Sequence, residues 1–164
     1  MGRSSPGVKP LNSKNGENDL RIAVRVHSDL KYVDLFHALL TQVAKEISLD
    51  PERCDWVALS LREAINNAVL HGNGKDPEKW VEVEMEHRDG VLYLRVWDQG
   101  KGLDEACLRD PRKEENLFKP NGRGIFLIKQ FVDSVRFLRD RPGHFGIEMM
   151  VALPASPQGG RKAR

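Results

Sequence analysis

Two kinds of hydrophobic spacing divide most of this chain into expected strands and helices. Apolar residues alternate with polar ones in residues 21–27, 80–87 and 91–98, as in strands with one buried face. Apolar residues recur at helical spacing from residue 30 to about residue 47, and again in residues 51–71. The pattern therefore predicts the order β-α-α-β-β for the first 98 residues.

Glycines and prolines mark where these elements begin and end. Asp50-Pro51 places a capping residue and a helix-starting proline before the second helix, which is expected to stop at Gly72. Asp89-Gly90 between two alternating runs predicts a β-hairpin.

The last third of the chain predicts a helix and two closing strands. NGRGIFLIKQFV, residues 121–132, has the pattern of a Gly-rich turn entering a short helix, and SVRFLRD and HFGIEMMVAL have the pattern of strands. The fold class predicted is an α+β two-layer sandwich: a mixed, largely antiparallel sheet covered on one face by about three helices.

Three segments lie outside this regular pattern. Residues 100–120 form a polar stretch of about 20 residues, and loops of that length in a compact domain are usually functional. Residues 1–20 and 154–164 are rich in Gly, Ser, Pro and charge, so both are expected to be disordered tails around one domain, residues 21–153.

Charge and cysteine content argue against some classes of function. There are 26 Lys and Arg against 24 Asp and Glu, and the positive excess lies in the tails. The remaining core is mildly acidic, which argues against nucleic acid as the main ligand. Cys54 and Cys107 lack metal-site spacing. No apolar run resembles a membrane span or a signal peptide, so we expect a cytoplasmic protein.

The second predicted helix carries two polar residues that share a face. Glu63 and Asn67 are four residues apart, which places them one helical turn apart. Their oxygens can hold a hard cation, and the carboxylate can serve as a general base. Taken alone, such a pair is more often a solvated polar stripe.

The third predicted strand ends in an acidic residue followed by glycines. Asp98 can accept a hydrogen bond from an exocyclic amino group such as that of adenine. Gly100 and Gly102 allow a flat ligand to approach the backbone without meeting a Cβ. An isolated D-x-G-x-G is more often an ordinary glycine turn.

The third predicted helix starts at a glycine pair. Gly122 and Gly124 leave backbone N–H groups free at a helix N-terminus, where the dipole favours anions such as phosphate. Arg123, between them, suits phosphate geometry. A simple helix-entry turn is the alternative.

In combination the three motifs resemble the GHKL, or Bergerat-fold, ATP-binding superfamily, and within it the anti-sigma-factor serine/threonine kinases of bacterial partner-switching systems. The stretches that carry the resemblance are REAINNAVLHGN, WDQGKGLD and ENLFKPNGRGIFLIKQFVDSVRF. The resemblance covers about residues 21–153.

This resemblance implies a role for each motif. Glu63 would be the general base and Asn67 the Mg²⁺ ligand, with ATP as the bound nucleotide. Asp98 would bind the adenine amino group, with Gly100 and Gly102 beside the base. The phosphates would lie against three further residues, Gly122, Arg123 and Gly124.

Two departures from the family pattern bear on nucleotide binding. Many relatives begin the last strand with Gly-Thr, whereas this sequence has Gly146-Ile147, so a polar contact near Asp98 is expected to be missing. The segment between the two glycine motifs is also compact, which predicts weaker enclosure of the phosphates.

The resemblance implies a kinase that phosphorylates a STAS-type anti-anti-sigma antagonist, and it also implies a sigma factor as a second partner and a homodimer. One alternative is a non-catalytic or weakly ATP-binding module that sequesters a partner. A histidine kinase would need a phospho-accepting helix pair, which the roughly 20 residues before Arg21 are not expected to supply. The identities of the antagonist and the sequestered target, and whether sigma binding is retained, stay open from sequence.

Overall fold

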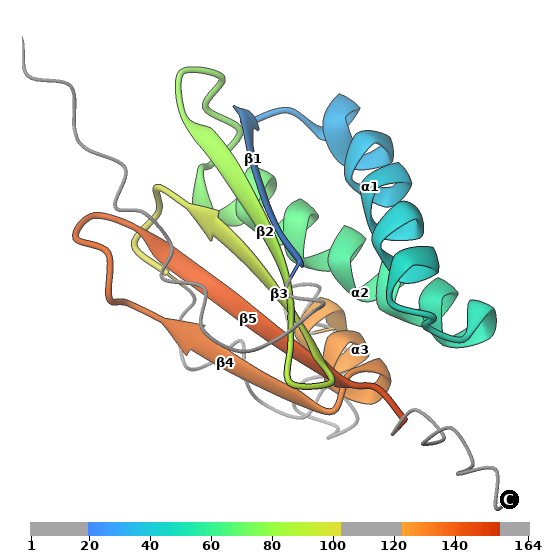
Figure 1. Ribbon diagram of the computed structural model, residues 1–164. Coiled ribbons are helices and arrows are strands. Elements are labelled where there is room, and N and C mark those ends of the chain that lie inside the picture. Colours follow the sequence, from blue (N-terminus) through green and yellow to red (C-terminus); the bar gives the residue numbers. More distant parts are fainter. Residues whose placement is uncertain (1–19, 103–122, 155–164) are drawn as a thin grey trace, which may run out of the picture.

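The computed structural model describes residues 20–102 and 123–154, which form one antiparallel sheet with helices on one face (Figure 1). The strands are β1 (Leu20–His27), β2 (Trp80–Arg88), β3 (Val91–Asp98), β4 (Ser134–Leu138) and β5 (Phe145–Ala152). Their order in the sheet is β1-β2-β3-β5-β4. The predicted α+β class is confirmed, and every pairing among these strands is antiparallel rather than mixed. The two predicted tails lie outside the described residues, apart from Leu20 and Pro154.

Three α-helices lie against the same face of the sheet (Figure 1). They are α1 (Val33–Glu46), α2 (Pro51–Asn67) and α3 (Arg123–Phe131). A 3-10 turn, η1 (Leu30–Tyr32), leads into α1, and a π-helical turn, η2 (Ala68–Gly72), continues α2. In the part of the chain that the structure describes, no helix is long and apolar enough to span a membrane.

The start of α2 follows the pattern read from the sequence. Asp50 accepts a hydrogen bond from the backbone N–H of Arg53 at 3.0 Å, and Pro51 occupies the first helical position. Both features satisfy or remove N–H groups that a helix start would otherwise leave unpaired. Helical structure ends at Gly72, as predicted, but its last turn is a π-helix rather than an α-helix.

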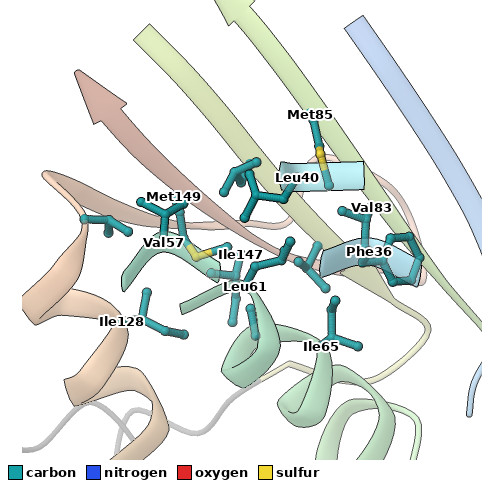
Figure 2. Packing of buried hydrophobic residues seen from close by; sticks show 14 of the residues in the cluster. Phe36, Leu40, Val57, Leu61, Ile65, Val83, Met85, Ile128, Ile147 and Met149 are labelled. Carbon is teal, nitrogen blue, oxygen red and sulfur yellow. The ribbon is translucent and has the colours of Figure 1, made fainter. Parts of the chain in front are cut away.

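The core lies between the helices and the sheet (Figure 2). Alternation along each strand points most of its apolar residues to the helix side, and on that side Met85 lies opposite Leu94, and Leu94 opposite Met149. The core side chains labelled in Figure 2 are Phe36, Leu40, Val57, Leu61, Ile65, Val83, Met85, Ile128, Ile147 and Met149. This packing fixes α2 against the strands whose ends form the candidate site.

The other face of the sheet carries a row of charges. The strand register places Glu84, Arg95, Glu148 and Arg136 side by side on four neighbouring strands. Arg95 donates to Glu148 at 2.6 Å and to Glu86 at 2.7 Å, and Arg136 donates to Glu148 at 2.5 Å. Glu84 pairs with Arg95 at 3.5 Å and with Arg141. Glu84 and Glu148 are each only 3% exposed, so their charges depend on these arginine partners.

Removing a buried member of this row is expected to cost more stability than removing an exposed one. The Glu148 side chain is 4% exposed and that of Arg136 is 60% exposed. Glu148→Ala leaves the Arg95 charge short of a partner, so the free energy of unfolding should fall by about 3 kcal/mol. Arg136→Ala, the matched control, should cost less than about 1 kcal/mol. Urea unfolding measures both, and equal losses would contradict the argument.

Candidate functional site

The polar face of α2 is in contact with the beginning of α3. Glu63 and Asn67 are both half-buried and lie one turn apart on α2. A Cβ on Gly124 would lie 3.0 Å from Glu63 Oε2 and 3.2 Å from Asn67 Nδ2. The structure therefore brings Glu63, Asn67 and the first turn of α3 together. A side chain at position 124 would crowd Glu63 and Asn67, so glycine suits this close approach.

Asn67 has a polar atom that the described protein residues do not satisfy. Its Nδ2 is buried and has no hydrogen-bond partner among residues 20–102 and 123–154. Leaving such a group unpaired costs about 1–3 kcal/mol. The site thus presents a carboxamide whose bonding is incomplete within the described protein.

Asp98 meets the end of the helical segment at Gly72. A Cβ on Gly72 would overlap the Asp98 carboxylate, and a Cβ on Gly100 would overlap the Gly72 carbonyl. Asp98 is 5% exposed, and its Oδ1 accepts a hydrogen bond from the Gly100 N–H at 2.7 Å. Gly102 has a φ of +91°, which favours glycine. Asp98 and the two predicted glycines therefore lie at one end of the helix that carries Asn67.

The environment of Asp98 disfavours its charge. Burial raises the pKa of the carboxyl group from its ordinary value of 3.8 to about 6. The Gly100 N–H and the positive charges of Lys79 and His144 act in the opposite direction without cancelling the effect of burial. A carboxylate with such a pKa is typical of functional sites.

A buried asparagine holds the strand end in place, and the sequence analysis did not identify it. Asn73 is 2% exposed; its Nδ2 donates to Ser28 Oγ at 3.0 Å and to the Trp80 carbonyl at 2.9 Å. Its Oδ1 accepts from the Gln99 N–H at 2.8 Å. The Gln99 side chain accepts in turn from the Trp80 N–H at 2.8 Å. The position of Asn73 between Gly72 and Gly74, at the end of a helix, is the sequence feature that could have identified it.

The last strand offers apolar neighbours to Asp98. Phe145 lies opposite Asp98, and Ile147 lies opposite Val96. Both are buried, with exposures of 3% and 4%. The loss of a polar contact near Asp98 that Gly146-Ile147 led us to expect stays a prediction.

Part of the predicted phosphate-binding motif lies outside the described residues. Gly122 and the compact segment of residues 103–120 lie outside the described residues. Arg123 begins α3, but its side chain is outside the described part. Gly124 is thus the member of this motif whose surroundings are described.

Comparison with known proteins gives one family. Residues 26–150 match the model of the histidine kinase-like ATPase domain. An anti-sigma F factor from Geobacillus stearothermophilus is 30% identical over 104 residues, covering 60% of this chain and 70% of that protein. A serine-protein kinase RsbW from Listeria monocytogenes serovar 1/2a (strain ATCC BAA-679 / EGD-e) is 25% identical over 126 residues, covering 73% of this chain and 80% of that protein.

These findings agree with the resemblance read from the three motifs. The family-model match covers most of the chain, and the five-stranded antiparallel sheet with its three helices is consistent with such a domain. An ATPase domain implies ATP binding. The chain belongs to the histidine kinase-like ATPase domain family, the GHKL group, and its relatives include anti-sigma factors and serine-protein kinases.

Proposed function

We propose that this protein is an ATP-dependent serine/threonine kinase and anti-sigma factor that phosphorylates a STAS-type antagonist. One observation carries the proposal: the first turn of α3 packs on Glu63 and Asn67, and the same helical segment ends against Asp98. A base, a phosphate-binding helix start and an adenine-binding carboxylate would then surround one bound nucleotide. The relatives named anti-sigma F factor and serine-protein kinase RsbW support the same role.

The nucleotide would bind along the helical segment from Gly72 to Asn67. Asp98 would accept a hydrogen bond from the adenine amino group, while Gly100 and Gly102 let the base approach the backbone. The phosphates would lie at the first turn of α3, at the positive end of the helix dipole, and Gly122, Arg123 and Gly124 of the predicted motif would bind them. In this arrangement each residue predicted to bind the nucleotide contacts one part of it, either the base or the phosphates.

Asn67 fits the role of a magnesium ligand. Mg²⁺ in nucleotide sites is commonly held by one or two protein side chains together with the substrate phosphates. The Asn67 Oδ1 would be the ligand. Within residues 20–102 and 123–154, the buried Nδ2 of the same carboxamide has no hydrogen-bond partner, and no cluster of three or more His, Cys, Asp or Glu could hold a metal by itself. When bound, Mg²⁺ would neutralise charge on the phosphates.

Glu63 would act on the attacking hydroxyl group. Its carboxylate would take the proton as the hydroxyl oxygen forms a bond to the γ-phosphorus, while the bond from that phosphorus to the β–γ bridging oxygen breaks and ADP leaves. The N–H groups at the start of α3 would stabilise the negative charge of the transferring group. Positioning and electrostatics would supply most of the catalysis.

Phosphorylation would release the antagonist, and the kinase would then sequester a sigma factor. We also propose a homodimer in the cytoplasm as the working form. The alternative is a weakly ATP-binding module that sequesters its partner without phosphorylating it. Phe145 and Ile147, the apolar neighbours of the Asp98 strand end, favour this alternative because they offer no polar group to the base site.

Substitution of Glu63 tests whether the protein is a kinase or a module that only sequesters its partner. Glu63→Gln should lower the rate of phosphoryl transfer at least about a hundredfold, because the proton acceptor is lost. Nucleotide affinity should change less than about twofold, because the amide keeps the shape of the side chain. Glu52→Gln, at the exposed start of the same helix, is the matched control and should behave like the wild type.

The assay follows label from γ-labelled ATP to a candidate STAS-domain protein, and a fluorescent ADP analogue reports binding. Wild-type transfer by Glu63→Gln would contradict the role of the base. Binding of the STAS protein by the wild type without any transfer would favour the sequestering alternative.

Nucleotide affinity should depend on pH through Asp98. The carboxyl pKa of about 6 means that lowering the pH below 6 protonates the acceptor of the adenine amino group. Affinity should therefore be highest above about pH 7 and fall roughly tenfold by about pH 5. Titrations of wild type and Asp98→Asn with the same ADP analogue measure the effect. The variant removes the Asp98 contribution and leaves that of the phosphates, so parallel pH profiles would overturn the assignment.

A further inference from the structure

The hairpin that joins β4 to β5 contacts the strand end that carries Asp98. Three of its residues, Arg139, Arg141 and His144, reach the segment of residues 97–102 or its immediate neighbours. None of them belongs to the motifs that carry the family resemblance. The hairpin therefore supplies contacts to the site that the sequence analysis did not predict.

Arg139 lies against the glycine-containing part of that segment. Its Nη1 donates to the Lys101 carbonyl at 3.1 Å. A Cβ on Gly102 would lie 3.0 Å from both Nη atoms of Arg139 and 2.7 Å from Phe145 Cδ2. The guanidinium group also lies over the Phe145 ring, 5.1 Å from its centroid. Arg139 thus ties Lys101 and Gly102 to the residue that pairs with Asp98 across the sheet.

Arg141 anchors the same hairpin on the outer face of the sheet. It donates to Glu82 at 2.6 Å and also to the buried Glu84. Its guanidinium lies over the Trp97 ring, 4.1 Å from the centroid. Trp97 is 2% exposed and directly precedes Asp98. Because Glu84 is shielded from water, this anchor is less screened than a surface ion pair.

His144 completes the contact from the other side of the hairpin. Its ring stacks on Trp80 with centroids 4.9 Å apart. The Trp80 N–H donates to the Gln99 side chain, which belongs to the same segment. The hairpin is therefore attached at both of its ends to residues around Asp98.

The segment after Asp98 needs such attachments because glycine is conformationally free. Gly100 and Gly102 allow a ligand to approach, but they also raise the entropic cost of holding the backbone in one conformation. Gln99 is held by Asn73, and Gly100 by the Asp98 carboxylate. The bond that holds the Lys101 carbonyl comes from Arg139.

We infer that Arg139 and Arg141 are positioning residues for the nucleotide base. Arg139 fixes the backbone of Lys101 and Gly102 in the conformation that receives the base, and Arg141 fixes the hairpin that carries Arg139. Neither side chain needs to touch the nucleotide. The inference rests on the proposed function, since it assigns a role within the same nucleotide site.

The test compares two arginines at the β4 end of the hairpin. Arg139→Gln should weaken binding of the fluorescent ADP analogue about tenfold, as expected for loss of a charged hydrogen bond that orders the binding segment. Arg136→Gln, on β4 itself, is the matched control and should bind as the wild type does. Arg139→Lys keeps a charged donor for the Lys101 carbonyl and should recover most of the affinity.

Kinetics distinguish positioning from a loss of folded protein. For Arg139→Gln the KM for ATP should rise about tenfold while kcat stays within about twofold of the wild type. A merely structural role would lower kcat through the folded fraction and leave KM unchanged, and that result would overturn the inference. Urea unfolding of each variant checks the folded fraction. Should Arg141→Gln fail to fold, the exposed Arg139 still provides the test.

The outcomes also separate this inference from the proposed function. Tight nucleotide binding by both wild type and Arg139→Gln would overturn the positioning role and leave the kinase proposal intact. Absence of nucleotide binding by the wild type would overturn the proposed function, and the positioning role with it.

Discussion

The site depends on the contact between the backbone of Gly72 and the end of β3. A Cβ on Gly72 would overlap the Asp98 carboxylate, and a Cβ on Gly100 would overlap the Gly72 carbonyl. The contact brings the last turn of the helical segment onto the strand end, and it buries Asp98. At neutral pH the ionised, buried carboxyl costs the folded state about 3 kcal/mol relative to a carboxyl with the ordinary pKa of 3.8. Tolerance of that cost is typical of a residue kept for binding rather than for stability.

The π-helical turn η2 lies between Asn67 and the end of the helical segment at Gly72, the two places where this segment contributes to the candidate site. In η2 the Asn73 N–H donates to the Ala68 carbonyl at 2.7 Å, five residues back instead of four. A π turn is a local departure from regular geometry that occurs often at functional sites. Here it delivers Asn73 to the position where its side chain bonds Ser28, Trp80 and Gln99. Asn66, half-buried beside Asn67, gains no comparable explanation.

Sequence patterns predicted those features that depend on neighbouring residues. Alternation located the strands, Asp50-Pro51 located the start of α2, and the glycine motifs located Asp98 and Gly124. The spacing of Glu63 and Asn67 correctly placed both on one face. The π turn, the Asn73 bonds and the hairpin contacts depend on segments that are distant in sequence, and no local period encodes them. The row of charges likewise follows from strand register, which alternation alone does not fix.

At its end, strand β3 contributes neighbouring residues to opposite faces of the sheet. Asp98 shares the helix side with Val96, whereas Trp97 faces the outer side, where Arg141 and the buried Glu84 lie. A slip of this strand by one residue would exchange the two faces, losing the Asp98 contact with Gly72 and the Trp97 contact with Arg141 together. The ion pairs of Arg141 on the outer face therefore do more than stabilise the sheet. By fixing β3 and the hairpin from the outer side, they hold the carboxylate in register with the helix end on the inner side.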